Sequence, residues 1–290
     1  MRVWLDQALE RHAEAPEAVA AELAQHATSL PADAAGAELI ALAEHVWLGH
    51  LADAAGLRAF VDQLPADLHN AEATAPVLQR LAWALACLAD QPEPELLALP
   101  ALPDAQRWRA LQNVVLAMAL QGRCEAANAL LLRDEGKASS HGNAPAGRAF
   151  AASANNIASH LCAGPRGDAA RDALMLTAAA MSRRAWGHAG GALQVERAEY
   201  RLALCHAVLD QGAAALRHAQ QCLLICQAEG SDPVELFFAQ EAIARAHLAG
   251  ANADAAAGAR LQTQALLPGI SEADGLRAWC AAALETLPTA

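Results

Sequence analysis

Residues 191–229 read GALQVERAEYRLALCHAVLDQGAAALRHAQQCLLICQAE, and this stretch decides the fold class. Apolar residues recur every three or four positions on both sides of Gly212, which is the spacing of one face of an α-helix. The pattern predicts two amphipathic helices, 191–211 and 213–229, joined by a short turn. The same pattern continues in both directions and predicts helices along most of the chain, separated by turns that contain Gly, Pro, Asp or Asn.

The composition supports helices and argues against sheets. Val, Ile and Thr together supply 21 of the 290 positions, and Phe and Tyr supply 5. A sheet would therefore lack the β-branched and aromatic side chains that pack well in strands. Alanine is abundant, and it is the best helix former. We therefore expect an all-α protein.

The chain divides at residues 136–146, which lack a large apolar side chain to anchor them. We expect a flexible loop there, between a divergent helical-repeat half (1–135) and a second half (147–290). At the end of the chain we expect a capping helix over 272–286. Its predicted apolar stripe consists of Leu276, Trp279, Ala283 and Leu287.

A glycine followed five positions later by an alanine recurs at Gly49/Ala54, Gly122/Ala127, Gly187/Ala192 and Gly250/Ala255. The intervals of 73, 65 and 63 residues suggest an internal repeat of paired units. We expect glycines such as Gly122 and Gly250 to mark equivalent turns between the two helices of a pair.

The segment from Glu196 through Gly212 to Leu223 resembles the first helix, turn and second helix of a tetratricopeptide repeat, whose unit is about 34 residues long. The segment from Phe237 through Gly250 to Ala259 resembles the next unit. The Trp, Leu, Gly and Tyr usual in the first helix are mostly absent. The resemblance implies a right-handed α-α superhelix of antiparallel helix pairs, whose concave surface binds a protein segment.

Charge is unevenly distributed along the chain. Residues 1–135 carry −11, residues 136–226 carry +4 and residues 227–290 carry −5, for a total of −12. A basic middle between acidic ends concentrates an anionic ligand locally. The candidate ligand-binding residues are the arginines, amides and tyrosine of this basic middle: Arg148, Asn155, Asn156, Arg183, Arg184, Arg197, Tyr200 and Arg201. The alternative is that the arginines pair internally with Glu196, Glu199 and Asp172.

A weaker alternative site is a metal centre. Cys205 and His206 precede His218 and Cys222, and these four side chains offer nitrogen and sulfur ligands. Against this, ligands spaced four residues apart drift along a helix, and free cysteine is among the most buried residue types. We therefore expect Cys222 and Cys226 to be reduced, buried core residues without a metal.

Sequence patterns of common catalytic sites, such as His-Glu-x-x-His, Cys-x-x-Cys and Gly-x-Ser-x-Gly, do not occur. We nominate no catalytic residue and no cofactor. The net charge of −12 argues against nucleic acid as a partner. No apolar run approaches the roughly 18 residues of a membrane span. Seven scattered cysteines are typical of reduced thiols in the cytoplasm.

The sequence therefore predicts a non-catalytic, cytoplasmic adaptor of bacterial type, which binds an acidic protein segment or a small anion. A ligand- or metal-sensing helical domain and an all-α enzyme are the two alternatives.

Overall fold

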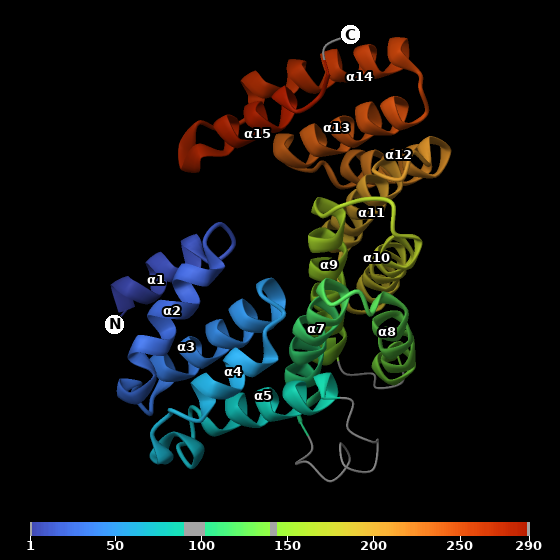
Figure 1. Ribbon diagram of the computed structural model, residues 1–290. Helices are drawn as coiled ribbons and strands as arrows, with labels where there is room; N and C mark the ends of the chain where they lie inside the picture. Colours follow the sequence, from blue (N-terminus) through green and yellow to red (C-terminus); the bar gives the residue numbers. More distant parts are fainter. Residues whose placement is uncertain (1, 90–101, 140–143, 289–290) are drawn as a thin grey trace. The chain divides into compact units, whose positions relative to one another are not determined.

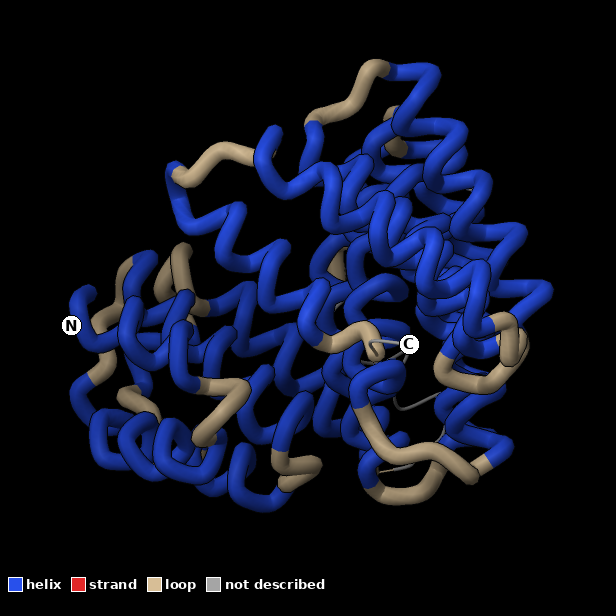
Figure 2. The backbone as a smooth tube through the Cα atoms, turned by 90° about the horizontal axis from the view of Figure 1, so that it is seen from above, coloured by secondary structure: helices blue, strands red, loops and turns tan. Residues whose placement is uncertain are grey.

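The computed structural model describes residues 2–89, 102–139 and 144–288. Helices make up 81% of the described structure. Figure 2 shows them joined by short loops, with no strand in any of these ranges. The expected all-α class is confirmed. Within the same ranges, no helix has the length and hydropathy needed to cross a bilayer.

The chain forms two compact units, which we call the N-terminal unit (Met1–Ala138) and the C-terminal unit (Ser139–Ala290). The elements of the N-terminal unit, labelled in part in Figure 1, are α1 (Arg2–Arg11), α2 (Pro16–His26), η1 (Ala27–Ser29), α3 (Ala34–Glu44), η2 (His45–His50), α4 (Ala54–Val61), η3 (Ala66–His69), α5 (Ala75–Leu88), α7 (Asp104–Leu120) and α8 (Cys124–Ser139).

The core of the N-terminal unit surrounds η2, which is a π-helix that continues α3 without a break. Helices α2, α3, α4 and α7 all pack against it. Val46, Trp47 and Leu48 of η2 are buried. The helical run from Ala34 to His50 thus ends in turns that are wound more widely than an α-helix, which the apolar pattern did not predict.

The segment between the two units is more helical than expected. Helix α8 runs to Ser139 and α9 begins at Ala144, so helices occupy both ends of the expected loop 136–146. Gly136 is tolerated in α8 because one glycine in a helix costs only about 1 kcal/mol. Pro145 lies in the first turn of α9, where proline is favoured. Residues 140–143 of the expected loop lie outside the described residues.

The C-terminal unit is built from three helix pairs and a final helix. Its elements are α9 (Ala144–Ala163), α10 (Ala169–Ala189), α11 (Ala192–Ala207), α12 (Gly212–Glu229), α13 (Pro233–Ala249), α14 (Ala253–Leu266), η4 (Leu267–Gly269), η5 (Ala273–Gly275) and α15 (Leu276–Glu285).

The helices of each pair, α9/α10, α11/α12 and α13/α14, pack against each other. Only three to five residues connect them, so the two helices of a pair run antiparallel. The first helices also touch along the series, because α9 contacts α11 and α11 contacts α13. These three helices follow one another along the unit in Figure 1.

One turn geometry recurs between paired helices. Gly122, Asp210 and Ala251 have positive φ values of 74°, 56° and 54°, and each lies two residues before the next helix. In every case the N–H of the following residue donates to the carbonyl five positions earlier: Arg123 to Met118, Gln211 to His206 and Asn252 to His247. The three turns therefore share a backbone conformation, although only one of them has glycine at the residue with positive φ.

The glycine repeat that the sequence suggests is wrong in register. Gly122 is equivalent to Ala251, and Gly250 has an ordinary φ of −90°. Gly187 lies inside α10, and Gly49 lies inside η2. Alanine and aspartate adopt the left-handed conformation here because the capping hydrogen bonds of the turn offset its modest cost.

The C-terminal helix begins later and faces differently than expected. Residues 273–275 form η5, in which Asp274 and Gly275 both have positive φ, and α15 starts at Leu276. This turn changes the direction of the chain just before α15. Cys280, Leu284 and Leu287 are buried against α13 and α14, whereas Trp279 remains 57% exposed. The predicted stripe was therefore wrong for both Leu276 and Trp279, which are exposed, although α15 does pack on the end of the unit.

Candidate functional site

A groove of about 500 Å³ lies over the first helices of the three pairs in the C-terminal unit. Ser159 and Cys162 line it from α9, Tyr200 and Arg201 from α11, and Glu241, Arg245 and Leu248 from α13. The groove exists because α9, α11 and α13 lie side by side, so that residues far apart in the sequence share one surface.

The part of the groove on α13 is a preformed hydrogen-bond network. Glu241 is almost fully buried, and burial raises the pKa of its carboxyl group, while the charge of Arg245 opposes the rise. The Tyr200 hydroxyl donates to Glu241 Oε2 at 3.2 Å, and Arg245 Nε donates to Oε1. Arg245 also donates to Thr286 Oγ1 at 2.6 Å. These contacts hold Tyr200 and Arg245 in place.

Arg201 differs from Arg245 because it lacks such a partner. Its Nε is buried without a hydrogen-bond acceptor, and the side chain forms no ion pair within the described residues. A guanidinium in this state retains the capacity to bind an anion from the groove. Arg201 is therefore the groove side chain whose buried donor a ligand would satisfy.

Cys162 lies in the same groove beside the Cys205 thiol. A hydrogen bond from Cys205 is the main reason that the pKa of Cys162 falls to about 7, and the charges of Arg201, Arg166 and Arg245 add to the effect. The same contact and burial raise the pKa of Cys205. Sequence reasoning missed Cys162, because nothing local indicates that α9 places it against α11.

Of the eight predicted ligand-binding residues, two line the groove and six do not. Tyr200 and Arg201 line the groove. Arg183 is paired with Glu199, and Arg197 is paired with Glu235 of α13, so both arginines have internal acidic partners. The remaining four are not among the residues that line the groove: Arg148 and Asn156 are exposed on α9, Asn155 is half-buried on α9, and Arg184 is exposed on α10.

The alternative metal set of the sequence analysis is not assembled. The rings of His206 and His218 stack with centroids 5.3 Å apart. His218 Nδ1 instead lies 2.7 Å from Glu199 Oε2, and the Cys205 thiol donates a hydrogen bond to Cys162. The Cys222 thiol donates to Glu196 Oε1 at 2.8 Å. The four candidate ligands therefore point to different partners.

Cys222 and Cys226 are buried, as predicted. All seven cysteines lie among the described residues, and each is a free thiol. Cys222 and Cys226 form a compact group with the buried Glu196. The hydrogen bond with Cys226 and burial raise the pKa of Cys222, which favours the protonated thiol.

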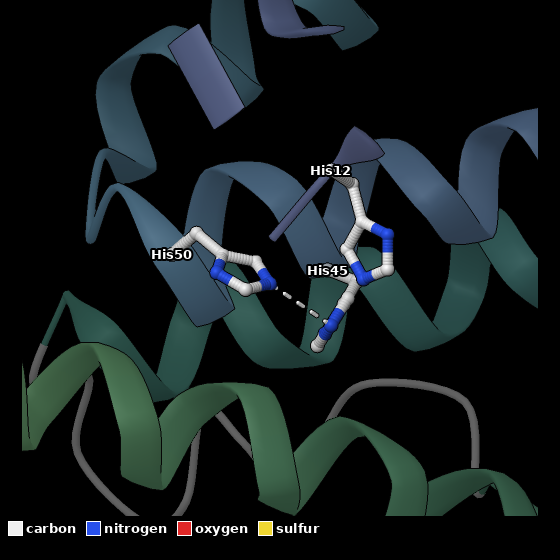
Figure 3. A group of neighbouring side chains, drawn as sticks. All are labelled: His12, His45 and His50. Atoms are coloured by element: carbon white, nitrogen blue, oxygen red, sulfur yellow. Dashed lines mark hydrogen bonds between the residues drawn. The ribbon is translucent and has the colours of Figure 1, made fainter. Parts of the chain in front are cut away.

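A second cluster, which sequence reasoning also missed, lies in the N-terminal unit. Figure 3 shows the imidazole rings of His12, His45 and His50 gathered at one point. The ring centroids are 4.8 to 5.2 Å apart. Residues five apart, such as His45 and His50, lie about 140° apart around an α-helix, so their spacing gave no signal.

The chain has no match among models of protein families, curated proteins or solved structures.

Proposed function

We propose that this protein is a non-catalytic, tetratricopeptide-like adaptor that binds an extended acidic peptide segment in the groove over α9, α11 and α13. The observation that carries the proposal is the half-buried Arg201, whose Nε has no acceptor and which lies in a groove of about 500 Å³. An anionic group of the peptide satisfies this guanidinium with charge-assisted hydrogen bonds.

The surroundings of Arg201 support a peptide as the ligand. Tyr200 offers a rigid aromatic surface, and the apolar chains of Leu204, Val208 and Leu248 line the rest of the groove. Aromatic and arginine side chains in partly buried pockets dominate peptide-binding energies. In our proposal the three helix pairs form a right-handed superhelix, of which α9, α11 and α13 form the concave face, as in other helical-repeat proteins. We place this adaptor in a bacterial cytoplasm, where its free thiols stay reduced.

Fluorescence anisotropy with labelled peptides tests the proposal. The probes are ten-residue peptides that end in Asp-Glu with a free carboxylate, and matched peptides in which both acids are replaced by amides. We expect the acidic peptides to bind more tightly. Binding should weaken as salt approaches about 1 M, where charges are screened beyond about 3 Å.

Arg201→Ala should weaken this binding about 10- to 100-fold, because a charged hydrogen bond of about 1.5–3 kcal/mol is lost. Arg217→Ala is the matched control: Arg217 is exposed on α12, outside the groove, and donates to a carbonyl of its own helix. Equal affinities of the two variants, in normally folded protein, would remove the groove as the binding site.

A further inference from the structure

The winding of η2 brings His45 and His50 to one side of the chain. The N–H of Leu51 donates to the carbonyl of Val46 at 3.1 Å, which is the five-residue spacing of a π-helix. Each turn is then wider than in an α-helix, and the fifth residue returns close to the face of the first. The turn after α1 adds His12, the third ring of the cluster (Figure 3). Short π-helical turns occur frequently at functional sites.

A buried network determines which nitrogen of His45 carries its proton. Arg80 Nε donates to Glu44 Oε2 at 2.7 Å, and Asn113 Nδ2 donates to Glu44 Oε1 at 3.1 Å. The Asn113 amide is thereby oriented with its oxygen 3.0 Å from His45 Nδ1. An amide oxygen only accepts hydrogen bonds, so Nδ1 carries the proton and Nε2 keeps its lone pair.

His12 is held in the same tautomer. Its Nδ1 lies 2.6 Å from the carbonyl oxygen of Leu9, so this nitrogen is the donor and Nε2 has the lone pair. Two neutral imidazoles with their Nδ1–H groups bonded to oxygens are the arrangement usual for histidine metal ligands.

The spacing of the ring nitrogens matches a metal site. Nε2 of His50 and Nε2 of His45 are 3.3 Å apart. Two nitrogens bound to one tetrahedral zinc at about 2.0–2.1 Å are also separated by about 3.3 Å. The two nitrogens also lie within hydrogen-bonding distance of each other, as the dashed line in Figure 3 marks. One nitrogen from each of the three rings lies within 4.8 Å of the others.

Gly49 makes room for this arrangement. A Cβ atom at Gly49 would lie 2.9 Å from His45 Nδ1 and 3.5 Å from Asn113 Oδ1. Any larger residue would push the ring away from the amide that orients it. The position of the His45 ring therefore depends on the Asn113 amide that orients it and on the absence of a side chain at Gly49.

We propose that His12, His45 and His50 bind one divalent transition-metal ion through their Nε2 atoms, with zinc as the fitting example. Three neutral imidazoles suit zinc, copper or nickel, whereas magnesium and calcium require oxygen ligands. The fourth position of a tetrahedral ion would be filled by water or by a small ligand. This site belongs to the N-terminal unit and is independent of the peptide groove proposed above.

Titration of the full-length protein with zinc chloride, followed by calorimetry and by metal analysis after dialysis, tests the proposal. We expect one zinc ion per chain. His45→Gln and His50→Gln should each weaken binding at least about 100-fold, beyond the range of about 10- to 100-fold typical when an outer-shell partner is lost. Absence of zinc binding by the unaltered protein would overturn the proposal.

Two controls separate this site from other histidines. His69→Gln alters an exposed histidine of the same unit and should leave the affinity unchanged. The double variant His206→Gln, His218→Gln removes the stacked pair of the C-terminal unit and should also bind zinc normally. Loss of zinc from the double variant, with retention in His45→Gln, would assign the metal elsewhere and refute the proposal.

Two further variants test whether a loss of zinc affinity comes from the loss of a ligand or from misfolding of the π-helix. His12→Gln changes a turn residue outside η2, so its circular dichroism should match the unaltered protein while zinc affinity falls. Asn113→Ala removes the orienting amide and leaves all three ligands, and it should weaken zinc about 10- to 100-fold. A folded His12→Gln variant that retains full zinc affinity would contradict the three-histidine site.

Discussion

At the scale of single residues, Cys162 and Cys87 are the two half-buried cysteines, and the other five are buried. Their environments shift the pKa of the thiol in opposite directions. The Cys205 hydrogen bond and nearby arginines hold the pKa of Cys162 at about 7, whereas burial raises the pKa of Cys87 to about 12. Since the thiolate is the reactive form, Cys162 should react far faster than Cys87 at neutral pH.

Limited alkylation with iodoacetamide at about pH 7, with peptide mass spectrometry, checks this order. We expect Cys162 to be modified first, and Cys162→Ser to remove the fast phase. Bound acidic peptide should slow the reaction, because Cys162 lines the proposed groove. Faster labelling of Cys87 would show that the hydrogen bond from Cys205 does not stabilise the thiolate.

Glu196 is a buried acid whose pKa is raised to about 7, mainly by burial. The unfolded chain releases this proton near the ordinary value of 4.5, while the folded chain retains it until about 7. The unfolded state therefore binds fewer protons in this window, and the free energy of unfolding should fall as pH rises through it. The expected loss is on the order of 3 kcal/mol, at about 1.4 kcal/mol for each pKa unit.

Urea denaturation at a series of pH values, compared between the unaltered protein and Glu196→Gln, measures this loss. The amide has the same shape and does not titrate, so the difference between the two curves should grow from about pH 4.5 to 7 and then become constant. A difference that is independent of pH would mean that Glu196 ionises normally in the folded chain.

At the scale of helices, the backbones of α12 and α13 meet closely at one point. Gly212, the first residue of α12, lies against Gly250, and a Cβ atom at Gly212 would lie 2.4 Å from the Cα of Gly250. Gly212→Ala should therefore force the two helix pairs apart and destabilise the fold by about 1–3 kcal/mol, a typical cost of overpacking.

Gly258→Ala is the matched control for this prediction. Gly258 lies within α14, and a Cβ atom there would meet no other atom within 4 Å. The exchange should stabilise the helix by about 0.5–1 kcal/mol, because alanine is the better helix former. Both changes are readily measured by urea denaturation. Equal effects of the two substitutions would contradict the close contact at Gly212.

At the scale of the whole molecule, the far-UV circular dichroism spectrum should be dominated by helix. The described structure is 81% helix without strands. The composition leaves few β-branched and aromatic residues from which a sheet might form. A strand content above about one fifth would overturn the fold, since it would exceed what an all-α protein allows.

Local features of the helices were predictable because they depend on neighbouring residues. The apolar spacing located α11 and α12 to within a few residues. The start of α13 is likewise local: the Asp232 side chain accepts from the N–H of Val234 as an N-cap, and Pro233 begins the helix. Scarcity of strand-forming residues likewise determined the all-α class.

Only the tertiary structure decided which side chains are available for binding. Arg183, Arg197 and Arg201 look alike in the sequence, but contacts with other helices supply Glu199 and Glu235 to the first two and leave the third unpaired. His45 and His50 come together because η2 is wound as a π-helix, and Asn113 of α7 orients the ring. Periodicity along one helix carries no information about such contacts, since they join residues distant in the chain. The sequence by itself thus determined the helices, and packing between them determined the sites.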